Sequence, residues 1–201
     1  MIINMKNLSS EKAYKLLSGA IVPRPIAWVS TISKEGNMNL APFSFFTVVS
    51  RNPPTLGISI GPGIGSREGT IKDTLLNIME TKEFVVNIVS KELVVEMHQS
   101  SGNYPPEENE FEHTGLTPVS SESVKAPRIL ESPISMECRL TKSMEIGTDT
   151  FLLGEIMQFH IDDTLYINHY KINIQKLEPI ARLAGNYAEI KSLFTLEKPY
   201  E

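Results

Sequence analysis

The sequence predicts a mainly β protein, a barrel or sandwich of short strands with helices added in the connections. Short apolar and β-branched runs dominate the chain, and the few helical patterns among them do not alternate strictly with strands. Strict alternation would indicate a doubly wound parallel sheet. No internal repeat and no flexible linker divides the 201 residues. We therefore expect one domain over residues 1–201.

The composition excludes several classes of protein. The chain is 41% hydrophobic and 21% charged, with a formal net charge of −5, which excludes a disordered or collagen-like chain. The acidic balance argues against nucleic acid or an anionic membrane as the main partner. Residues 1–10 lack the apolar core of a signal peptide, and no uncharged stretch reaches the ~18 continuous apolar residues of a spanning helix. We expect a cytoplasmic protein.

The first half of the chain opens with a helix and continues with strands. Ser9 and Ser10 provide a helix N-cap, apolar residues then recur at helical spacing, and Gly19 provides a stop. A turn at 34–37 and the breaker at 52–54 separate the β-branched runs that follow. Strands are expected at 26–33, 45–49, 55–60, 84–89, 134–142 and 151–161.

Two further helices and one long excursion interrupt the strands. A helix is expected at 73–80, where a capping residue precedes an apolar stripe, and a weaker one at 91–99. Residues 100–127 are polar, punctuated by proline and rich in glutamate. Such a run is typical of a solvated loop more than of a binding surface.

Several kinds of protein-based chemistry are absent from the sequence. The single cysteine, Cys138, excludes a disulfide, dithiol or iron–sulfur centre within the chain, and the four histidines lack metal-ligand spacing. The run 61–66 fails the dinucleotide fingerprint because Ser66 stands where the third glycine is needed. We expect no metal site and nominate no catalytic side chain. The chemistry is expected to come from a bound small molecule.

Three segments suit a ligand with a flat heteroaromatic head and an anionic tail: 23–31, 39–46 and 72–78. Lys72 and Thr74 stand at a predicted helix start, where free N–H groups and the helix dipole favour a phosphate. Asp73 would repel that phosphate, so we expect it to cap the helix and point away. The alternative is that these residues form a helix cap and nothing more.

Pro42 interrupts the second of these segments. Because proline lacks an N–H, we expect the amides of Ala41, Phe43 and Ser44 to turn outward rather than into a ladder. Beside Ser30, Thr31 and Ser44, such amides would contact the carbonyl and nitrogen edge of a flavin ring. The alternative is a proline-interrupted edge strand with core phenylalanines.

In the order and spacing of its motifs, the chain resembles the flavin reductase-like family of FMN-binding split-barrel proteins. The resemblance covers nearly the whole length. It includes Pro-Arg-Pro-Ile-Ala-Trp-Val-Ser-Thr, Asn-Leu-Ala-Pro-Phe-Ser-Phe-Phe and Lys-Asp-Thr-Leu-Leu-Asn-Ile in the three segments above. It continues through 83–87, 110–117, 132–138, 179–183 and Tyr187.

The resemblance implies a six-stranded antiparallel split barrel with Greek-key connections and peripheral helices. It also implies a homodimer with FMN near the interface. The residues that would line the flavin are Ser30, Thr31, Asn39, Ala41, Ser44, Phe45, Phe46 and Ser59. Lys72, Asp73 and Thr74 would lie at the phosphate end, with Arg182 and Tyr187 close to the flavin pocket. The stretch 61–69 is richer in glycine than the family pattern, so the phosphate loop is expected to differ in shape.

The activity implied is that of an NAD(P)H-dependent flavin reductase. Hydride would pass from the nicotinamide of NADH or NADPH to flavin N5, and reduced FMN would serve a partner such as a monooxygenase. The alternative is a flavoredoxin-like electron carrier that holds FMN tightly and does not turn over NAD(P)H. A flavin-binding module without turnover is a third interpretation.

Overall fold

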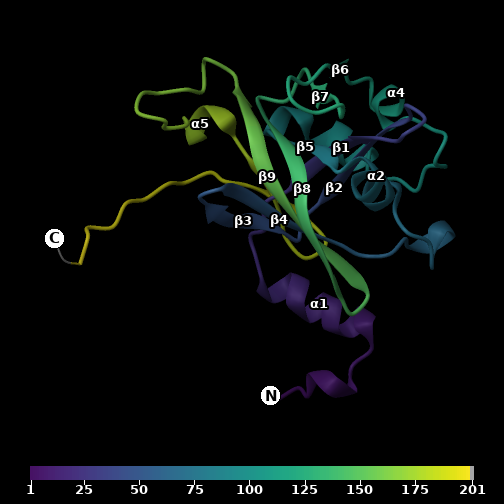
Figure 1. Ribbon diagram of the computed structural model, residues 1–201. Helices are drawn as coiled ribbons and strands as arrows, with labels where there is room; N and C mark the ends of the chain where they lie inside the picture. The colour runs from purple at the N-terminus through teal and green to yellow at the C-terminus, as the bar shows by residue number, and fades with distance from the viewer. Residues whose placement is uncertain (200–201) are drawn as a thin grey trace.

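The structure, a computed structural model, describes residues 1–199 and is built on one antiparallel sheet. Figure 1 shows this sheet, with the long hairpin of the strands labelled β8 and β9 crossing the molecule. Along the sheet the strand order is β2-β1-β5-β8-β9-β4-β3. These strands span Ala27–Ile32 (β1), Met38–Phe43 (β2), Phe46–Arg51 (β3), Pro54–Ile60 (β4), Glu83–Ile88 (β5), Ile134–Ile146 (β8) and Asp149–Ile161 (β9). The prediction of a mainly β protein is confirmed.

The two edge strands of this sheet, β2 and β3, follow one another in the chain. Only Ser44 and Phe45 separate them, so the sheet has to curl until its edges approach. The backbone N–H of Ser59 on β4 donates to the Phe45 carbonyl at 2.8 Å, next to this junction. The result is a split barrel, as expected. It has seven strands rather than six, because residues 38–43, which are not among the strands expected from the sequence, form the edge strand β2.

A Greek-key connection brings one helix to the side of the barrel. Strand β5 follows β4 in the chain but lies beside β1. The connection between them carries a short 3-10 turn, η2 (Gly65–Arg67), and the helix α2 (Asp73–Thr81). Helix α2 packs against β1 and β2, which places its first turn beside the edge strand.

The barrel interior is filled by alternate side chains of its strands. Gly154 on β9 marks its tightest point, because a Cβ there would collide with the ring of Phe84 on β5. A second apolar cluster around Trp28 and Leu40 lies under short helical segments. These segments are η3 (Lys91–Leu93), α3 (Val94–Gln99) and α4 (Glu110–Thr114). The expected solvated loop at 100–127 therefore contains a helix and the small strand β6 (Pro118–Val119), which pairs with β7 (Arg128–Ile129) directly after it.

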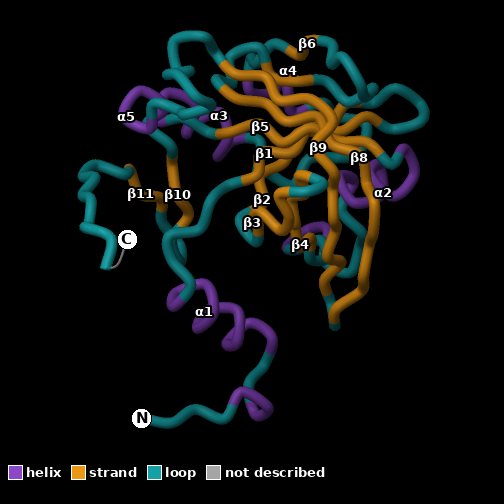
Figure 2. Tube along the Cα trace, turned by 60° about the vertical axis from the view of Figure 1, so that its left-hand side comes forward, coloured by secondary structure: helices purple, strands orange, loops and turns teal. Residues whose placement is uncertain are grey.

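The chain ends lie outside the barrel. Figure 2 shows α1 (Ser10–Ala20) standing away from the sheet, preceded by the turn η1 (Met5–Asn7). Ser9 caps α1 by accepting from the Lys12 amide at 3.4 Å, so the expected helix is confirmed. Gly19 is not its stop, because the helix continues through Gly19 to Ala20. The C-terminal part contains α5 (Ile174–Leu177), β10 (Ile180–Arg182) and β11 (Tyr187–Glu189). Within residues 1–199, every helix is too short or too polar to cross a bilayer.

Candidate functional site

A cavity of about 90 Å³ lies between β2 and the first turn of α2. Two loops, 61–70 and 100–104, complete its walls. Five of the residues singled out in the sequence line it together: Asn39, Ala41, Lys72, Asp73 and Thr74. Their convergence makes this cavity the candidate site.

Asn39 joins the edge strand to the helix. Its Oδ1 accepts a hydrogen bond from Thr74 Oγ1 at 2.6 Å, and its Nδ2 donates to Glu110 Oε1 at 2.7 Å. The other oxygen of Glu110 accepts from the Leu40 backbone amide at 3.0 Å. Burial raises the pKa of Glu110, while the bonds from Leu40 and Asn39 oppose that rise. Asn39 and Leu40 on β2 thus bind one carboxyl oxygen each and hold Glu110 in place as part of the cavity wall.

Lys72 supplies a cation at the N-terminus of α2. It is half-buried, and within residues 1–199 no carboxylate lies within salt-bridge distance of it. Its nitrogen lies 5.6 Å from the centroid of the Phe43 ring. Burial, followed by the charge of Arg67, lowers the pKa of Lys72. A cation held in this way is available to an anion.

The first turn of α2 adds backbone donors. Lys72 is the N-cap residue and makes no side-chain capping bond. The first intrahelical bond runs from the Leu76 amide to the Lys72 carbonyl at 3.1 Å. The amides of residues 73–75 therefore have no carbonyl partner within the helix. A helix start of this kind favours an anion.

Asp73 does not cap the helix, so that expectation was wrong. It is the first helical residue, one position too late for a cap, and its carboxylate accepts from both terminal nitrogens of Arg67. The Nη2–Oδ1 distance is 2.9 Å. This bidentate pairing neutralises the carboxylate and so removes most of its repulsion toward an anion in the cavity. The sequence reading missed Arg67, which lies in the glycine-rich stretch.

The edge of β2 also differs from expectation. The Leu40 amide points away from β1, toward Glu110, and N–H groups of successive strand residues point to alternate sides. The amides of Ala41 and Phe43 therefore point toward β1 and not outward. Pro42 occupies an outward position, where its missing N–H costs no ladder bond.

Ser30 and Thr31 lie behind the cavity wall rather than on it. Both side chains are buried. Ser30 Oγ donates to the Pro127 carbonyl at 2.5 Å and accepts from Asn87 Nδ2 at 3.1 Å. Thr31 Oγ1 accepts from Asn77 Nδ2 at 3.0 Å and lies 3.4 Å from Asn39 Oδ1. Through these bonds the two hydroxyls support β1 and β2 from inside.

Three other candidates cluster at the junction of β2 and β3. Ser44 Oγ accepts from Arg24 Nε at 3.3 Å, and the Arg24 guanidinium lies 5.8 Å from the Phe45 ring centroid. Phe46, the first residue of β3, is partly buried against the barrel core. Ser59 lies next to this junction through its bond to Phe45, and its Oγ donates to Asp149 at 3.4 Å.

The C-terminal candidates reach the same junction through the backbone. Arg24 and Arg182 exchange backbone hydrogen bonds of 3.0 and 2.9 Å. The Arg182 guanidinium lies 4.6 Å from the Tyr187 ring centroid, and the Tyr187 hydroxyl lies 3.1 Å from His98 Nδ1. Arg24 is buried, and its guanidinium also bonds the carbonyls of Ser18, Ile21 and Leu183. In the sequence Arg24 stands between Pro23 and Pro25, and no side-chain role was expected for it.

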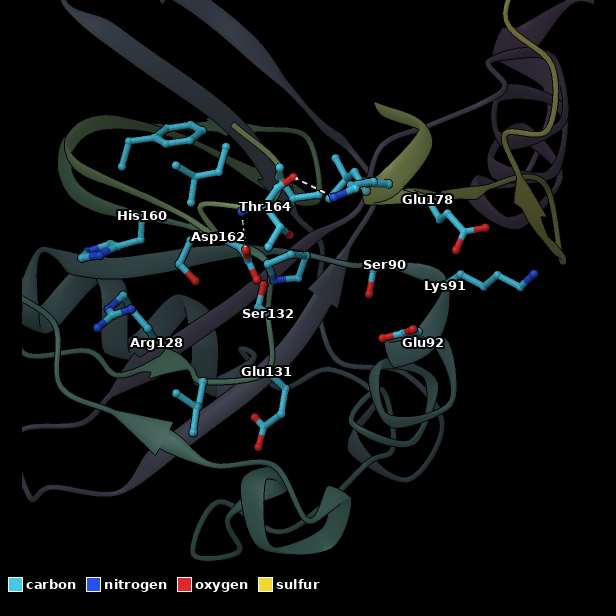
Figure 3. Close-up of a pocket in the computed structure, with 18 residues that line it drawn as sticks. Ser90, Lys91, Glu92, Arg128, Glu131, Ser132, His160, Asp162, Thr164 and Glu178 are labelled. Atoms are coloured by element: carbon cyan, nitrogen blue, oxygen red, sulfur yellow. Dashed lines mark hydrogen bonds between the residues drawn. The ribbon is translucent and has the colours of Figure 1, made fainter. Parts of the chain in front are cut away.

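A larger cavity of about 700 Å³ lies elsewhere, where β5 and β9 end and β8 begins. Figure 3 shows Arg128, His160, Asp162 and Ser132 around it. None of the sequence candidates lines it, and its walls carry charges of both signs. His160 is engaged with the buried Glu137 at 2.6 Å, although Arg128 Nε is buried without a partner. The smaller cavity therefore remains the candidate site, because the residues singled out in the sequence converge there and not here.

Cys138 is fully buried on β8, and burial raises the pKa of its thiol. Within residues 1–199, no group of three or more His, Cys, Asp or Glu side chains is placed to hold a metal ion.

A family model of the flavin reductase like domain matches residues 18–178. The chain belongs to the flavin reductase-like family. An uncharacterised protein of Aquifex aeolicus is 46% identical over 183 residues, which cover 91% of this chain and 92% of the relative.

Several solved structures superpose on the chain over nearly its full length. Nitrilotriacetate monooxygenase component B from Bacillus cereus matches with a TM-score of 0.92 and 37% identity, covering 98% of each chain. The 2-nitrobenzoate 2-nitroreductase NbaA of Pseudomonas fluorescens matches with a TM-score of 0.89 and 30% identity, covering 100% of this chain and 97% of that one. Flavoredoxin of Desulfovibrio vulgaris (Miyazaki F), at 24% identity and a TM-score of 0.77, covers 100% of this chain and 98% of its own and shares the fold. Membership of the flavin reductase-like family indicates that this chain is a flavin-binding oxidoreductase.

Proposed function

We propose that this flavin reductase-like chain is an FMN-binding, NAD(P)H-dependent flavin reductase. The single observation that carries the proposal is the half-buried Lys72. It stands at the uncapped first turn of α2 and lines a polar cavity, with no acidic partner within residues 1–199. A terminal phosphate is an anion of the size and charge that such a cavity favours.

The residues present fit the phosphate of FMN. Lys72 provides a charge, the first-turn amides of α2 provide donors, and the Arg67 pairing cancels the charge of Asp73. The Thr74 hydroxyl already donates its hydrogen bond to Asn39 Oδ1 and so has no donor left for a phosphate; it serves the site by holding the helix in place. These groups orient an anion without any movement of a buried charge.

The flavin ring needs more room than this cavity offers. Ligand pockets are roughly 300–1,000 Å³, whereas this one measures about 90 Å³. We place the ring outside it, along β2 toward Ser44, Phe45 and Phe46, with Ser59, Arg182 and Tyr187 at the far end. Ser30 and Thr31 then support the ring's strand from behind.

A second copy of the chain would cover the ring. Helix α1 leaves Tyr14 and Leu17 each 50% exposed, and Ile21 63% exposed. Arg24 links the end of this helix to Ser44, so a partner packed on α1 also approaches the ring. We therefore propose a homodimer with FMN near its interface.

When bound, FMN supplies the hydride acceptor for NADH or NADPH, and the protein supplies position and electrostatics. Lys72 and the amides of α2 hold the phosphate, and the strand edge between Leu40 and Phe46 aligns the ring. We assign no protein side chain as a catalytic acid or base, because hydride transfer to the flavin requires none.

The acceptor of the reduced flavin is proposed from the neighbours. One of them is named as a component of nitrilotriacetate monooxygenase, so we propose that reduced FMN passes to a partner monooxygenase. The second candidate is a flavoredoxin-like electron carrier, favoured by the flavoredoxin that shares this fold.

Steady-state oxidation of NADH and of NADPH, each with and without added FMN, tests the proposal. A flavin reductase oxidises at least one nucleotide in an FMN-dependent manner. Oxidation of neither, together with a yellow cofactor retained through dialysis, would contradict the reductase and support the carrier. Failure to bind any flavin would contradict both.

A further inference from the structure

The glycine-rich stretch 61–70 is braced against the loop 100–104, on the side of the candidate site away from β2. Asn103 Nδ2 donates to the Ile64 carbonyl at 3.1 Å, and Arg67 Nη1 donates to the Tyr104 carbonyl at 3.2 Å. The Tyr104 ring is itself stacked on His113, with centroids 4.3 Å apart. The two loops therefore form one wall that rests on α4.

Glycines make this contact possible. A Cβ on Gly63 would collide with the Arg67 carbonyl, and one on Gly102 would come within 2.8 Å of the Tyr104 ring. Gly65 has a φ of +60°, and a Cβ there would lie 3.1 Å from Asn103 Nδ2. Gly63 and Gly102 thus allow each loop to fold tightly on itself, and Gly65 allows Asn103 of the opposite loop to approach.

The braced wall borders a small cavity. Its volume of about 90 Å³ is well below the roughly 300–1,000 Å³ of pockets that take up a whole ligand. It suits a single phosphate, and we expect an adenosine attached through a second phosphate to meet the loops 61–70 and 100–104. A phosphomonoester also carries about −1.5 to −2 charges, more than either phosphate of a diester-linked pyrophosphate.

We infer that the braced loops 61–70 and 100–104, joined through Asn103 and Arg67, are a specificity determinant that admits FMN and excludes FAD. The inference rests on the proposed function, because it concerns the phosphate end of the same site. Asn103 is the residue to change, since it is exposed and bonds the opposite loop through its side chain alone.

Isothermal titration of the flavin-free protein with FMN, FAD and riboflavin tests the inference. The native protein is expected to bind FMN at least about 30-fold more tightly than FAD. Asn103→Ala removes the hydrogen bond between the two loops. It should reduce the preference for FMN over FAD by at least about fivefold, mainly by tightening the binding of FAD. Gly63→Ala forces loop 61–70, the other half of the wall, to shift. It should also reduce the preference for FMN over FAD. Asn168→Ala, an exposed asparagine in the 162–173 loop, is the matched control and should leave the ratio unchanged.

The outcomes separate this inference from the proposed function. Similar affinity of the native protein for FMN and FAD would overturn the specificity role while leaving a flavin site in place. A ratio unchanged in both Asn103→Ala and Gly63→Ala, with circular dichroism showing both folded, would also overturn it. If no flavin binds the native protein, the proposed function itself fails.

Discussion

Thr74 Oγ1 donates a 2.6 Å hydrogen bond to Asn39 Oδ1, joining the first turn of α2 to the edge strand of the barrel. Both side chains are buried, and 35 residues of chain separate them. Because the bond is shielded from water, it holds the two walls of the small cavity at a fixed separation. The phosphate site that we propose depends on that separation.

Lys72→Ala is expected to weaken FMN binding by about 1.5–3 kcal/mol, because a charge-assisted contact to the phosphate is lost. Riboflavin lacks the phosphate, so its affinity should change little. Titration of native and variant protein with both flavins measures the difference. Lys34→Ala, an exposed lysine in the β1–β2 turn, is the control. Equal losses for FMN and riboflavin would show that Lys72 does not contact the phosphate.

Leu17→Glu is expected to shift the protein from dimer to monomer. Leu17 is 50% exposed on α1, beside the other apolar side chains that a second copy would bury. A charge buried without a partner at such an interface costs several kcal/mol. Light scattering coupled to gel filtration measures the mass, with Lys12→Glu on the same helix as control. A native protein that runs as a monomer at all concentrations would contradict the dimer.

The sequence predicted much of this fold but less of the site. Alternating β-branched runs and the proline breakers located the long strands, because these signals are local. The Arg67–Asp73 pair escaped prediction because the loop, and not the helix, brings the guanidinium to Asp73. Glu110 was taken for part of a solvated charge run, yet it is buried 70 residues in sequence from Leu40, whose amide it accepts.

Ser30 illustrates the same limit from the opposite direction. A hydroxyl at the end of a strand is compatible with either a ligand or an internal partner. In the structure its partners are internal, namely the Pro127 carbonyl and Asn87, which lie 97 and 57 residues away in the chain. Such long-range partners leave no periodic or compositional signal. The glycines of 61–69 were visible in the sequence, but the approach of Asn103 to Gly65 from the opposite loop was not.

Gly154→Ala should destabilise the protein by about 1–3 kcal/mol, because the added methyl overpacks the barrel against the Phe84 ring. Gly19→Ala is the matched control. Gly19 lies in α1 with no atom within 4 Å of its missing Cβ, so this change should stabilise by about 0.4–1 kcal/mol. Urea unfolding compares the two variants. Equal effects would contradict the packing assigned to Gly154.

Glu137 is expected to make stability depend on acid pH. Burial raises the pKa of this carboxyl, but the Glu122 and Ser123 amides and His160 lower it more, so the net pKa lies below 4.5. A lowered folded-state pKa contributes stability above the unfolded value and loses it as the pH falls through the folded value. Glu137→Gln should therefore cost about 1–3 kcal/mol at neutral pH, and progressively less below pH 4.5.

Urea unfolding at a series of pH values measures this dependence. Glu112→Gln, a change at an exposed position on α4, should leave the profile of the native protein unchanged. A difference between native protein and Glu137→Gln that stays constant from neutral to acid pH would contradict the role of the ionised carboxylate.

A crystal structure of the protein with FMN tests the central claim most directly. We predict that the phosphate lies within hydrogen-bond distance of Lys72 Nζ and the first-turn amides of α2, with the ring along β2 toward Phe45. An FMN phosphate in the larger cavity beside Arg128 and His160, or anywhere other than the first turn of α2, would contradict the account.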